Sequence, residues 1–328
     1  MISDFGFRIS DFGIRNPLAF LVVVLLGLLP AALGFDRFYL LTLTFGYLFV
    51  GLAISWFLLA RAGQISLGHA AFFGLGAYAS AVSVLRLDVS PWVGLVLGTV
   101  AAVLFAVVVG LVCFRFHGLY FALATFAAAE VAKSVVLNWD SLTYGAQGLV
   151  GIPGFPAFSL GMLHVDFETS RLPNYYVALI FLVATLLIIH WMIHGSLGLA
   201  FTAVRESEEA AGAIGINPMR IKVIALLVSA AVTGAGGAVY AHVLHYLEPN
   251  LVFSVSVSSL PLVMSLFGGL VSLAGPLIGG LLLYLVDALL FQRFFPAWHL
   301  VLYGATLIFV VLYMPRGLMG WILEYGTS

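Results

Sequence analysis

Charged residues are scarce in this chain of 328 residues: they make up 8% of it, whereas 63% of the residues are hydrophobic. An ordinary soluble domain carries roughly 25% charged residues. A chain this poor in charge cannot cover a water-facing surface, but a surface that faces lipid tails needs no polar cover. The net charge of -1 argues against nucleic acid as a partner, because no basic patch is available to neutralise phosphates. The composition therefore indicates an integral membrane protein.

Cysteine and the common catalytic motifs are also missing. The single Cys113 excludes an intrachain disulfide and a cysteine-based metal cluster. The sequence has no Gly-Lys dipeptide, no His-Glu-x-x-His and no Gly-x-Ser-x-Gly, so the usual phosphate-binding, zinc-protease and esterase signatures are absent. His242 and His245 lie three residues apart with Glu248 nearby, but a metal would need more ligands, and polar anchoring at the membrane interface is the better explanation. We expect no catalytic residue, no metal and no cofactor on this chain.

Long apolar stretches dominate the sequence. A membrane-spanning helix needs about 20 mostly apolar residues, and ten stretches approach this length. They are Pro17–Phe35, Phe38–Ala60, Ile65–Leu85, Pro91–Cys113, Gly118–Asn138, Asn174–His194, Ile221–Leu244, Leu251–Val271, Leu273–Phe291 and Trp298–Met314. The third and eighth are rich in Gly, Ser and Pro, so one or both are predicted to be broken or re-entrant. The sequence thus predicts an all-α polytopic membrane protein with about ten transmembrane helices, in one domain over residues 17–315.

The two ends and the basic residues set the expected orientation. Residues 3–9 and 10–16 form a tandem repeat, which we interpret as a dispensable leader over residues 1–16, the alternative being an amphipathic interfacial segment. With the N-terminus inside, ten spans place eight basic residues in the cytoplasm and at most five outside, as the positive-inside rule favours. Both termini are therefore predicted to be cytoplasmic, including a tail over residues 316–328.

Two long polar connections interrupt the spans. Residues 139–173 lie outside in this topology, whereas residues 195–219 lie inside and carry the densest charge in the chain. Within the inner loop, Thr202–Ala213 is predicted to form one short exposed helix, with an ion pair between Arg205 and Glu209 at i,i+4. Asn217-Pro218 then starts the next helix as N-cap and first residue. This loop is either a solvated linker or a docking element for a cytoplasmic partner.

Polar residues also occur within the apolar stretches. Gln64, Ser66 and His69 accompany the glycines of Gly63–Gly76. Polar groups at membrane depth are costly and usually face the bundle interior or a water-filled path, so these residues indicate either a pathway or hydrogen bonds between helices. Small residues four apart, as in Gly94-x-x-x-Gly98, predict close helix packing. Three residues in the spans are candidates for ion or proton sites, and the first two are expected to pair: Glu130, Lys133 and Asp287.

Four stretches resemble LivM-type permeases, the membrane subunits of branched-chain amino acid ABC transporters. Ser196–Asn217 is similar to the cytoplasmic loop of that family, and Ala62–Tyr78, Gly118–Thr125 and Gly268–Pro276 are similar to its Gly-rich signatures, in the same order. The sequence departs from the family at Gly198-Leu199, where Gly-Arg is usual, and at Thr143-Tyr144-Gly145, where Thr-Gly-Gly is usual. The second departure lies in the outer loop.

The resemblance implies a site and a set of partners. The residues expected to couple to ATPase subunits are Arg205, Glu206, Glu208, Glu209, Ala210, Ala211 and Gly215. Those expected along the translocation pathway are Gln64, Ser66, Gly68, His69, Tyr120, Thr125, Gly268 and Gly269. The implied partners are two ATPase subunits that hold ATP and Mg, a LivH-type permease, a soluble binding protein on the outer face and the lipid of a bacterial inner membrane.

The expected function is that of an importer subunit for leucine, isoleucine, valine or a related small polar solute. Sister permeases for urea and short amides are an alternative within the same family. An ion-coupled secondary transporter is the alternative of another class, because such proteins place ionisable residues at the membrane midplane. An intramembrane enzyme is disfavoured, since no nucleophile is paired with a base.

Overall fold

The computed structural model describes residues 26–34, 36–160, 163–165, 167, 170–314 and 317–325. Within these ranges, eight helical segments are long and apolar enough to cross a membrane. They are α2 (Arg37–Arg61), α3 (His69–Leu87), α4 (Pro91–Cys113), α5 (Leu119–Asn138), α7 (Leu172–His194), α10 (Pro218–Leu244), the Pro249–Gly268 segment formed by α11 (Pro249–Val252) and α12 (Val255–Gly268), and the Gly275–Phe294 segment formed by η3 (Gly275–Gly279), α13 (Gly280–Val286), η4 (Asp287–Phe291) and α14 (Gln292–Phe294).

These segments correspond to the second to ninth expected spans, so the predicted all-α polytopic fold is confirmed. The tandem repeat and most of the first expected span lie outside the described residues. The tenth expected span is the shorter helix α15 (His299–Tyr313). Residues expected to form a simple tail contain a further helix, α16 (Gly317–Tyr325), which packs against α12 and η3.

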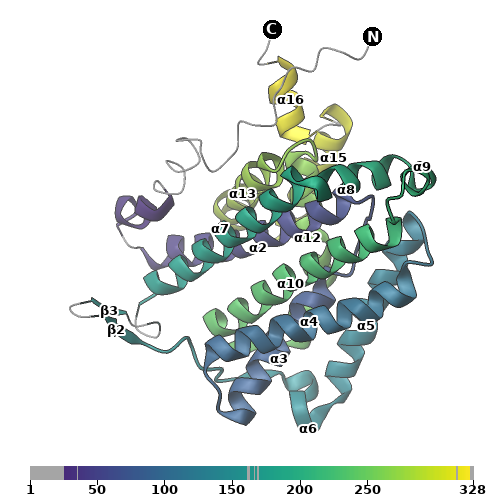
Figure 1. Ribbon diagram of the computed structural model, residues 1–328. Coiled ribbons are helices and arrows are strands. Elements are labelled where there is room, and N and C mark those ends of the chain that lie inside the picture. Colours follow the sequence, from purple (N-terminus) through teal and green to yellow (C-terminus); the bar gives the residue numbers. More distant parts are fainter. Residues whose placement is uncertain are drawn as a thin grey trace.

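Helix α10 is central to the packing and lies between α2 and α4 (Figure 1). It contacts α3 and α4 through small residues on all three helices. A Cβ atom on Gly76 would overlap the backbone of Gly234, and one on Gly98 would overlap the carbonyl of Gly76. The helix backbones are therefore in direct contact, as predicted for small residues four apart. On its other side α10 packs against α2, which is buried over most of its length and also contacts α7 and α12.

Both spans that were predicted to be irregular are irregular. Helix α3 begins only at His69, so the chain from Gln64 to Gly68 is not helical. The eighth expected span is split between α11 and α12, which also contains Pro261, and its end at Gly269 has a φ of 98°. Such breaks persist at membrane depth where the backbone is buried in protein or lines a cavity.

The connection over residues 139–173 folds back onto the end of α10. It contains α6 (Asp140–Thr143), η2 (Gly145–Gln147), β1 (Leu149–Val150), β2 (Phe158–Leu160) and β3 (Leu163–Val165). β1 pairs antiparallel with β4 (Tyr246–Leu247), and β2 pairs with β3. The Nδ1 atom of His242 donates to the carbonyl of Pro153 at 2.7 Å, and that of His245 donates to Ile152 at 2.9 Å. The two histidines thus anchor this connection, and the described residues contain no group of three metal-ligating side chains.

Candidate functional site

The most unusual backbone in the membrane region is the turn and non-helical segment between α2 and α3. It begins after Arg61 with Gly63, whose φ of 75° lies in the region that favours glycine. Four helices then hold the segment and the first turn of α3. The side chains that do so are Trp56 of α2, Thr125 of α5, Ser229 of α10 and Ser258 of α12.

Side chains satisfy the backbone groups that a helix would otherwise have paired. The indole Nε1 of Trp56 donates to the carbonyl of Ser66 at 2.9 Å. The N–H of Leu67 donates to the Thr125 hydroxyl at 3.1 Å, and the N–H of Ala70 donates to the Ser258 hydroxyl at 3.0 Å. The first N–H groups of a helix have no partner within the helix, so a helix that starts inside a membrane needs such acceptors.

The end of the segment that joins α3 lies deep in the protein. The Nε2 atom of His69 is 3.1 Å from the Ser229 hydroxyl. Ser229 is eleven residues after the start of α10 at Pro218, which places it roughly 16 Å along that helix at 1.5 Å per residue. A helix of 27 residues is roughly 40 Å long, so His69 lies nearly halfway along α10.

Two buried polar atoms of this segment have no hydrogen-bond partner among the described residues. They are the Oε1 atom of Gln64 and the Nδ1 atom of His69. Gln64 is 5% exposed and His69 is 0% exposed. Leaving a buried polar group unpaired costs about 1–3 kcal/mol, so such groups usually have a structural or functional reason. Here one unpaired amide oxygen and one unpaired imidazole nitrogen lie within six residues of each other.

The loop over residues 195–219 forms two helices, so the single helix expected over Thr202–Ala213 is wrong. The structure has α8 (Ser196–Glu206) and α9 (Glu208–Ala213), separated by Ser207 in an extended conformation. The Ser207 hydroxyl accepts from the N–H of Ala210 at 3.2 Å, while its own N–H donates to the carbonyl of Ala203 at 3.1 Å. Serine is a strong N-cap residue, and this preference outweighs helix continuity here.

The ion pairs of this loop also differ from the expected one. Arg205 pairs with its neighbour Glu206 at 2.8 Å rather than with Glu209. Glu208 forms an ion pair with Lys222 of α10, whose side chain is only 5% exposed. This pair attaches α9 to α10. The predicted N-cap is confirmed, because the Asn217 side chain accepts from the N–H of Arg220 at 3.1 Å.

Most of the seven predicted coupling residues are accessible. The exposed ones are Arg205, Glu206, Glu209, Ala210 and Gly215. Glu208 is half-buried through its pair with Lys222, and Ala211 is buried against the rest of the protein. The loop therefore presents an exposed face and is attached through a buried one.

Helix α8 contacts the opposite end of the segment, where it leaves α2. The Arg61 guanidinium donates to the Thr202 hydroxyl at 3.3 Å. A Cβ atom on Gly63 would lie 3.3 Å from the Cα atom of Arg205, so the two backbones are in contact. The chain from Gly63 to His69 thus runs from α8, in the loop over residues 195–219, to the buried polar cluster around Ser229.

A family profile described as "branched-chain amino acid transport system / permease component" matches residues 38–311. The chain belongs to this permease family. It is therefore a multi-pass membrane subunit of an ABC transporter and a transport protein without catalytic activity of its own. Membership also implies a complex with ATPase subunits and a binding protein.

Curated relatives carry the names of two permease types. Over 295 residues the permease is 26% identical to the high-affinity branched-chain amino acid transport system permease protein LivM of Escherichia coli (strain K12), which covers 85% of this chain and 68% of that protein. It is 23% identical over 269 residues to LivH, a permease protein of the same strain, covering 79% and 86% of the two chains. The LivH protein of Salmonella typhimurium gives 24% over 272 residues. No solved structure matches the permease significantly.

The structure brings together some of the predicted pathway residues and separates others. Gln64, Ser66, Gly68 and His69 lie in the non-helical segment or directly after it, and Thr125 binds the backbone of that segment. Tyr120 is 73% exposed on the first turn of α5.

Gly268 and Gly269 lie apart from this segment. A Cβ atom on Gly268 would overlap the carbonyl of Gly275, and one on Gly317 would overlap the backbone of Gly269. These glycines therefore pack the end of α12 against η3 and α16.

Sequence reasoning missed four residues that build the site. They are Trp56, Ser229, Ser258 and Lys222. Ser229 is the one serine of α10 and Ser258 is one of four in α12, and serine within a helix commonly bonds its own helix backbone. The sequence gives no signal of a partner 160 or 188 residues away. Lys222 was assigned only a role in orientation, although it is one of two lysines in the chain.

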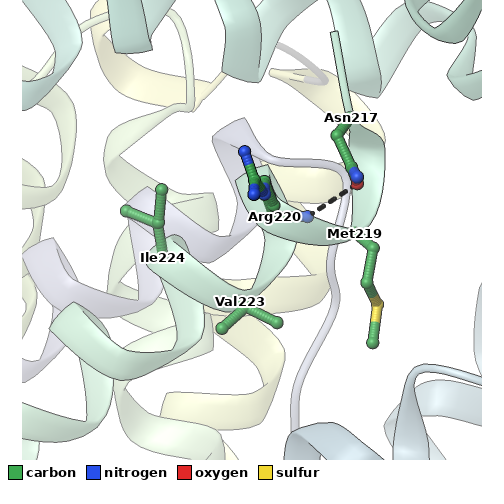
Figure 2. Close-up of a pocket in the computed structure, with 5 residues that line it drawn as sticks. All are labelled: Asn217, Met219, Arg220, Val223 and Ile224. Carbon is green, nitrogen blue, oxygen red and sulfur yellow. Dashed lines mark hydrogen bonds between the residues drawn. The ribbon is translucent and has the colours of Figure 1, made fainter.

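A shallow hollow lies at the N-terminal end of α10 (Figure 2). Its lining residues are Asn217, Met219, Arg220, Val223 and Ile224. Figure 2 shows the Asn217 side chain at the N-terminus of the helix, bonded to the N–H of Arg220. The hollow adjoins the loop over residues 195–219 and is far from His69 along α10.

Two ionisable positions decide how far an ion-coupled mechanism is supported. Glu130 and Lys133, which were expected to pair, are both described and no ion pair joins them. Asp287 accepts a hydrogen bond from the Gln292 side chain at 2.7 Å. One carboxylate oxygen of Asp287 therefore has a local partner, and the family assignment gives the permease a different source of energy.

Proposed function

We propose that the permease carries branched-chain amino acids, or closely related small polar solutes, in a complex with a LivH-type permease. Two ATPase subunits, which hold ATP and Mg, and a soluble binding protein on the outer face complete this complex. The similarity to both LivM and LivH proteins supports this assembly, because the two names occur in one transport system of one strain. Competition of leucine uptake by valine, and its resistance to urea, would separate the amino acid assignment from that of an amide carrier.

The proposed pathway passes the non-helical segment between α2 and α3. Gln64 and His69 offer an unpaired acceptor and an unpaired ring nitrogen, and Gly68, which has no side chain, lets Thr125 of α5 pack closely against the segment. An amino acid or amide carries hydrogen-bond donors and acceptors. As the solute loses its water, such groups of the protein can take the place of the lost water molecules as hydrogen-bond partners. The buried position of both side chains fits a state in which the path is closed to water.

In the proposed mechanism, the ATPase subunits bind α8 and α9. The observation that carries this proposal is the contact of α8 with Arg61 and Gly63, which directly precede Gln64 and the rest of the polar segment in the chain. A displacement of α8 would move Gly63 and, through it, the backbone that leads to His69. Closure of the ATPase pair would then be transmitted to the pathway by contacts between chain segments.

The proposed orientation follows from the basic residues and the docking role. Both termini and the loop over residues 195–219 lie in the cytoplasm, and the connection over residues 139–173 lies on the outer face of the bacterial inner membrane. The leader over residues 1–16 is proposed to be dispensable.

Charge reversal at Glu209 tests the docking role. Glu209 is exposed, whereas Glu208 holds the buried Lys222, so Glu209→Lys removes a partner contact without breaking the loop. In the reconstituted complex we expect solute-stimulated ATP hydrolysis to fall by about tenfold, which corresponds to about 1.4 kcal/mol of binding free energy.

The matched control is Asn250→Lys, which adds a cation at an exposed position beyond the opposite end of α10. It should leave hydrolysis unchanged. Normal stimulation in Glu209→Lys, with the ATPases still bound, would remove Glu209 from the docking surface.

A further inference from the structure

Helix α5 is held by the rest of the chain along one face only. Its buried residues are Phe121, Ala122, Thr125, Ala129, Ala132 and Val136, which follow the helical repeat. The opposite face is open along the whole helix. Among its residues, Leu123 is 52% exposed, Val131 is 61% exposed and Val135 is 50% exposed.

Charged and polar side chains lie on or beside this open face at membrane depth. Glu130 is eleven residues after Leu119, roughly 16 Å along the helix, and Lys133 and Ser134 follow within one turn. Glu130 and Lys133 are each half-buried, and Ser134 is exposed. Neither charged side chain has a hydrogen bond or an ion pair with any residue that the structure describes. A helix of 20 residues is roughly 30 Å long, so Glu130 lies near the middle of the membrane.

Helix α4 shows what a lipid-facing surface looks like in the same protein. Its exposed residues are apolar throughout, and its one polar residue, Thr99, bonds the carbonyl of Leu95 within the helix at 2.8 Å. Charges near the bilayer centre almost always face a bundle interior or a water-filled cavity and pair there. The open face of α5 is therefore unsuited to lipid, although it is as exposed as that of α4.

We infer that the open face of α5, with Glu130, Lys133 and Ser134, is the surface on which a second and different permease subunit packs. That partner presents polar or oppositely charged side chains at the same depth, so that both charges of this chain become paired. The inference rests on the proposed function, since it takes the partner from the proposed complex. Because Glu130 and Lys133 need polar partners, only a face of the partner that carries such side chains at this depth can pack against α5.

Photo-cross-linking in the membranes of cells that assemble the complete transporter tests this inference. Benzoylphenylalanine is placed at Ala127 or Val131 on α5, which are exposed at the depth of Glu130, and at Val100 or Leu104 on α4 as matched controls. We expect an adduct with another permease-family chain, identified by its peptides, from the two α5 positions and not from the α4 positions. Glu130→Gln should also lower the recovery of that partner by about threefold, the size of an average polar contact between membrane helices.

Three outcomes would overturn the inference. They are adducts from α4 alone, adducts that contain only peptides of this chain, and an absence of protein adducts from α5. The ATPases recovered with the same preparation separate this inference from the proposed function. If ATPases are present while α5 gives no adduct, only the surface is wrong. If neither ATPases nor a second permease are recovered, the proposed complex itself is wrong.

Discussion

Two glycine-rich regions of the permease use the same residue for opposite purposes. Where α3, α4 and α10 cross, Gly76, Gly98 and Gly234 lie within regular helices, and a side chain on any of them would collide with a neighbouring helix. Between α2 and α3 the chain is not helical; the side chains of Trp56, Thr125 and Ser258 bind the backbone of this segment and of the first turn of α3, and Ser229 binds the His69 ring. At the crossing the polar side chains have partners, as Ser80 of α3 has in His242 of α10 at 2.8 Å, whereas the non-helical segment retains unpaired polar atoms.

This difference teaches that glycine content alone does not mark a transport pathway. The second region is distinguished by the polar atoms beside its glycines, because the Oε1 atom of Gln64 and the Nδ1 atom of His69 are buried without a hydrogen-bond partner among the described residues. The crossing should therefore tolerate no added volume but respond little to changes in polarity. The segment should respond to the loss of polar groups while the protein stays folded. Three substitutions test this contrast.

The largest effect is expected from Gly76→Val. The new side chain would overlap the backbone of Gly234, which cannot move without separating α3 from α10. Overpacking a tight contact costs about 1–3 kcal/mol, and a clash between two backbones belongs at the upper end. We expect several-fold less folded protein by size-exclusion chromatography. Gly304→Val in α15 is the control, since nothing lies within 4 Å of a Cβ atom there, and equal yields for both variants would refute the close crossing.

A smaller effect on the fold, with a large effect on transport, is expected from His69→Leu. Leucine fills a similar volume, and the Ser229 hydroxyl can turn to a carbonyl of its own helix. Solute uptake in proteoliposomes should fall by about tenfold, equivalent to about 1.4 kcal/mol, while the complex still elutes intact.

Ser229→Ala is the companion to this variant, because it removes the same hydrogen bond but keeps the imidazole. It should transport nearly normally. If His69→Leu transports as well as the unsubstituted permease, the solute does not pass this residue.

The smallest effect is expected from Thr125→Val, which removes the acceptor of the Leu67 N–H. An unpaired buried donor costs about 1–3 kcal/mol, so the thermal midpoint of the protein in detergent should drop by a few degrees. Thr99→Val on α4 has the same shape change, but its hydroxyl bonds only its own helix. A drop of the same size in both variants would mean that the segment gains nothing from Thr125.

The spans and their order could be predicted because each is a long apolar run, and lipid leaves the backbone few alternatives to a helix. The break before His69 could also be predicted, since glycines and polar residues occur together there. The division of the predicted Thr202–Ala213 helix at Ser207 was missed, although an N-cap serine followed by two acids is a recognisable helix start. The prediction of a single helix rested instead on the charge pattern across Ser207.

The partners within the site could not be predicted, and the reason is physical. The segment is held by contacts between helices far apart in sequence, such as His69 with Ser229, and these depend on how the helices rotate about their axes. A uniformly apolar helix carries little information on its rotation. The expected pair of Glu130 and Lys133 failed for a related reason, because helical spacing permits a contact without favouring it over one with another subunit.

Helix α10 is engaged at both of its ends. Near its start Lys222 holds α9, and at its end His242 and His245 hold the connection over residues 139–173. If the helix moves as one rigid body between two positions, binding at one end that stabilises one position also stabilises that position at the other end. In the proposed complex, thermodynamic reciprocity then requires that bound nucleotide changes the affinity for the binding protein by the same factor as that protein changes the affinity for nucleotide. A single helix of 27 residues would thus couple the binding equilibria on the two sides of the membrane.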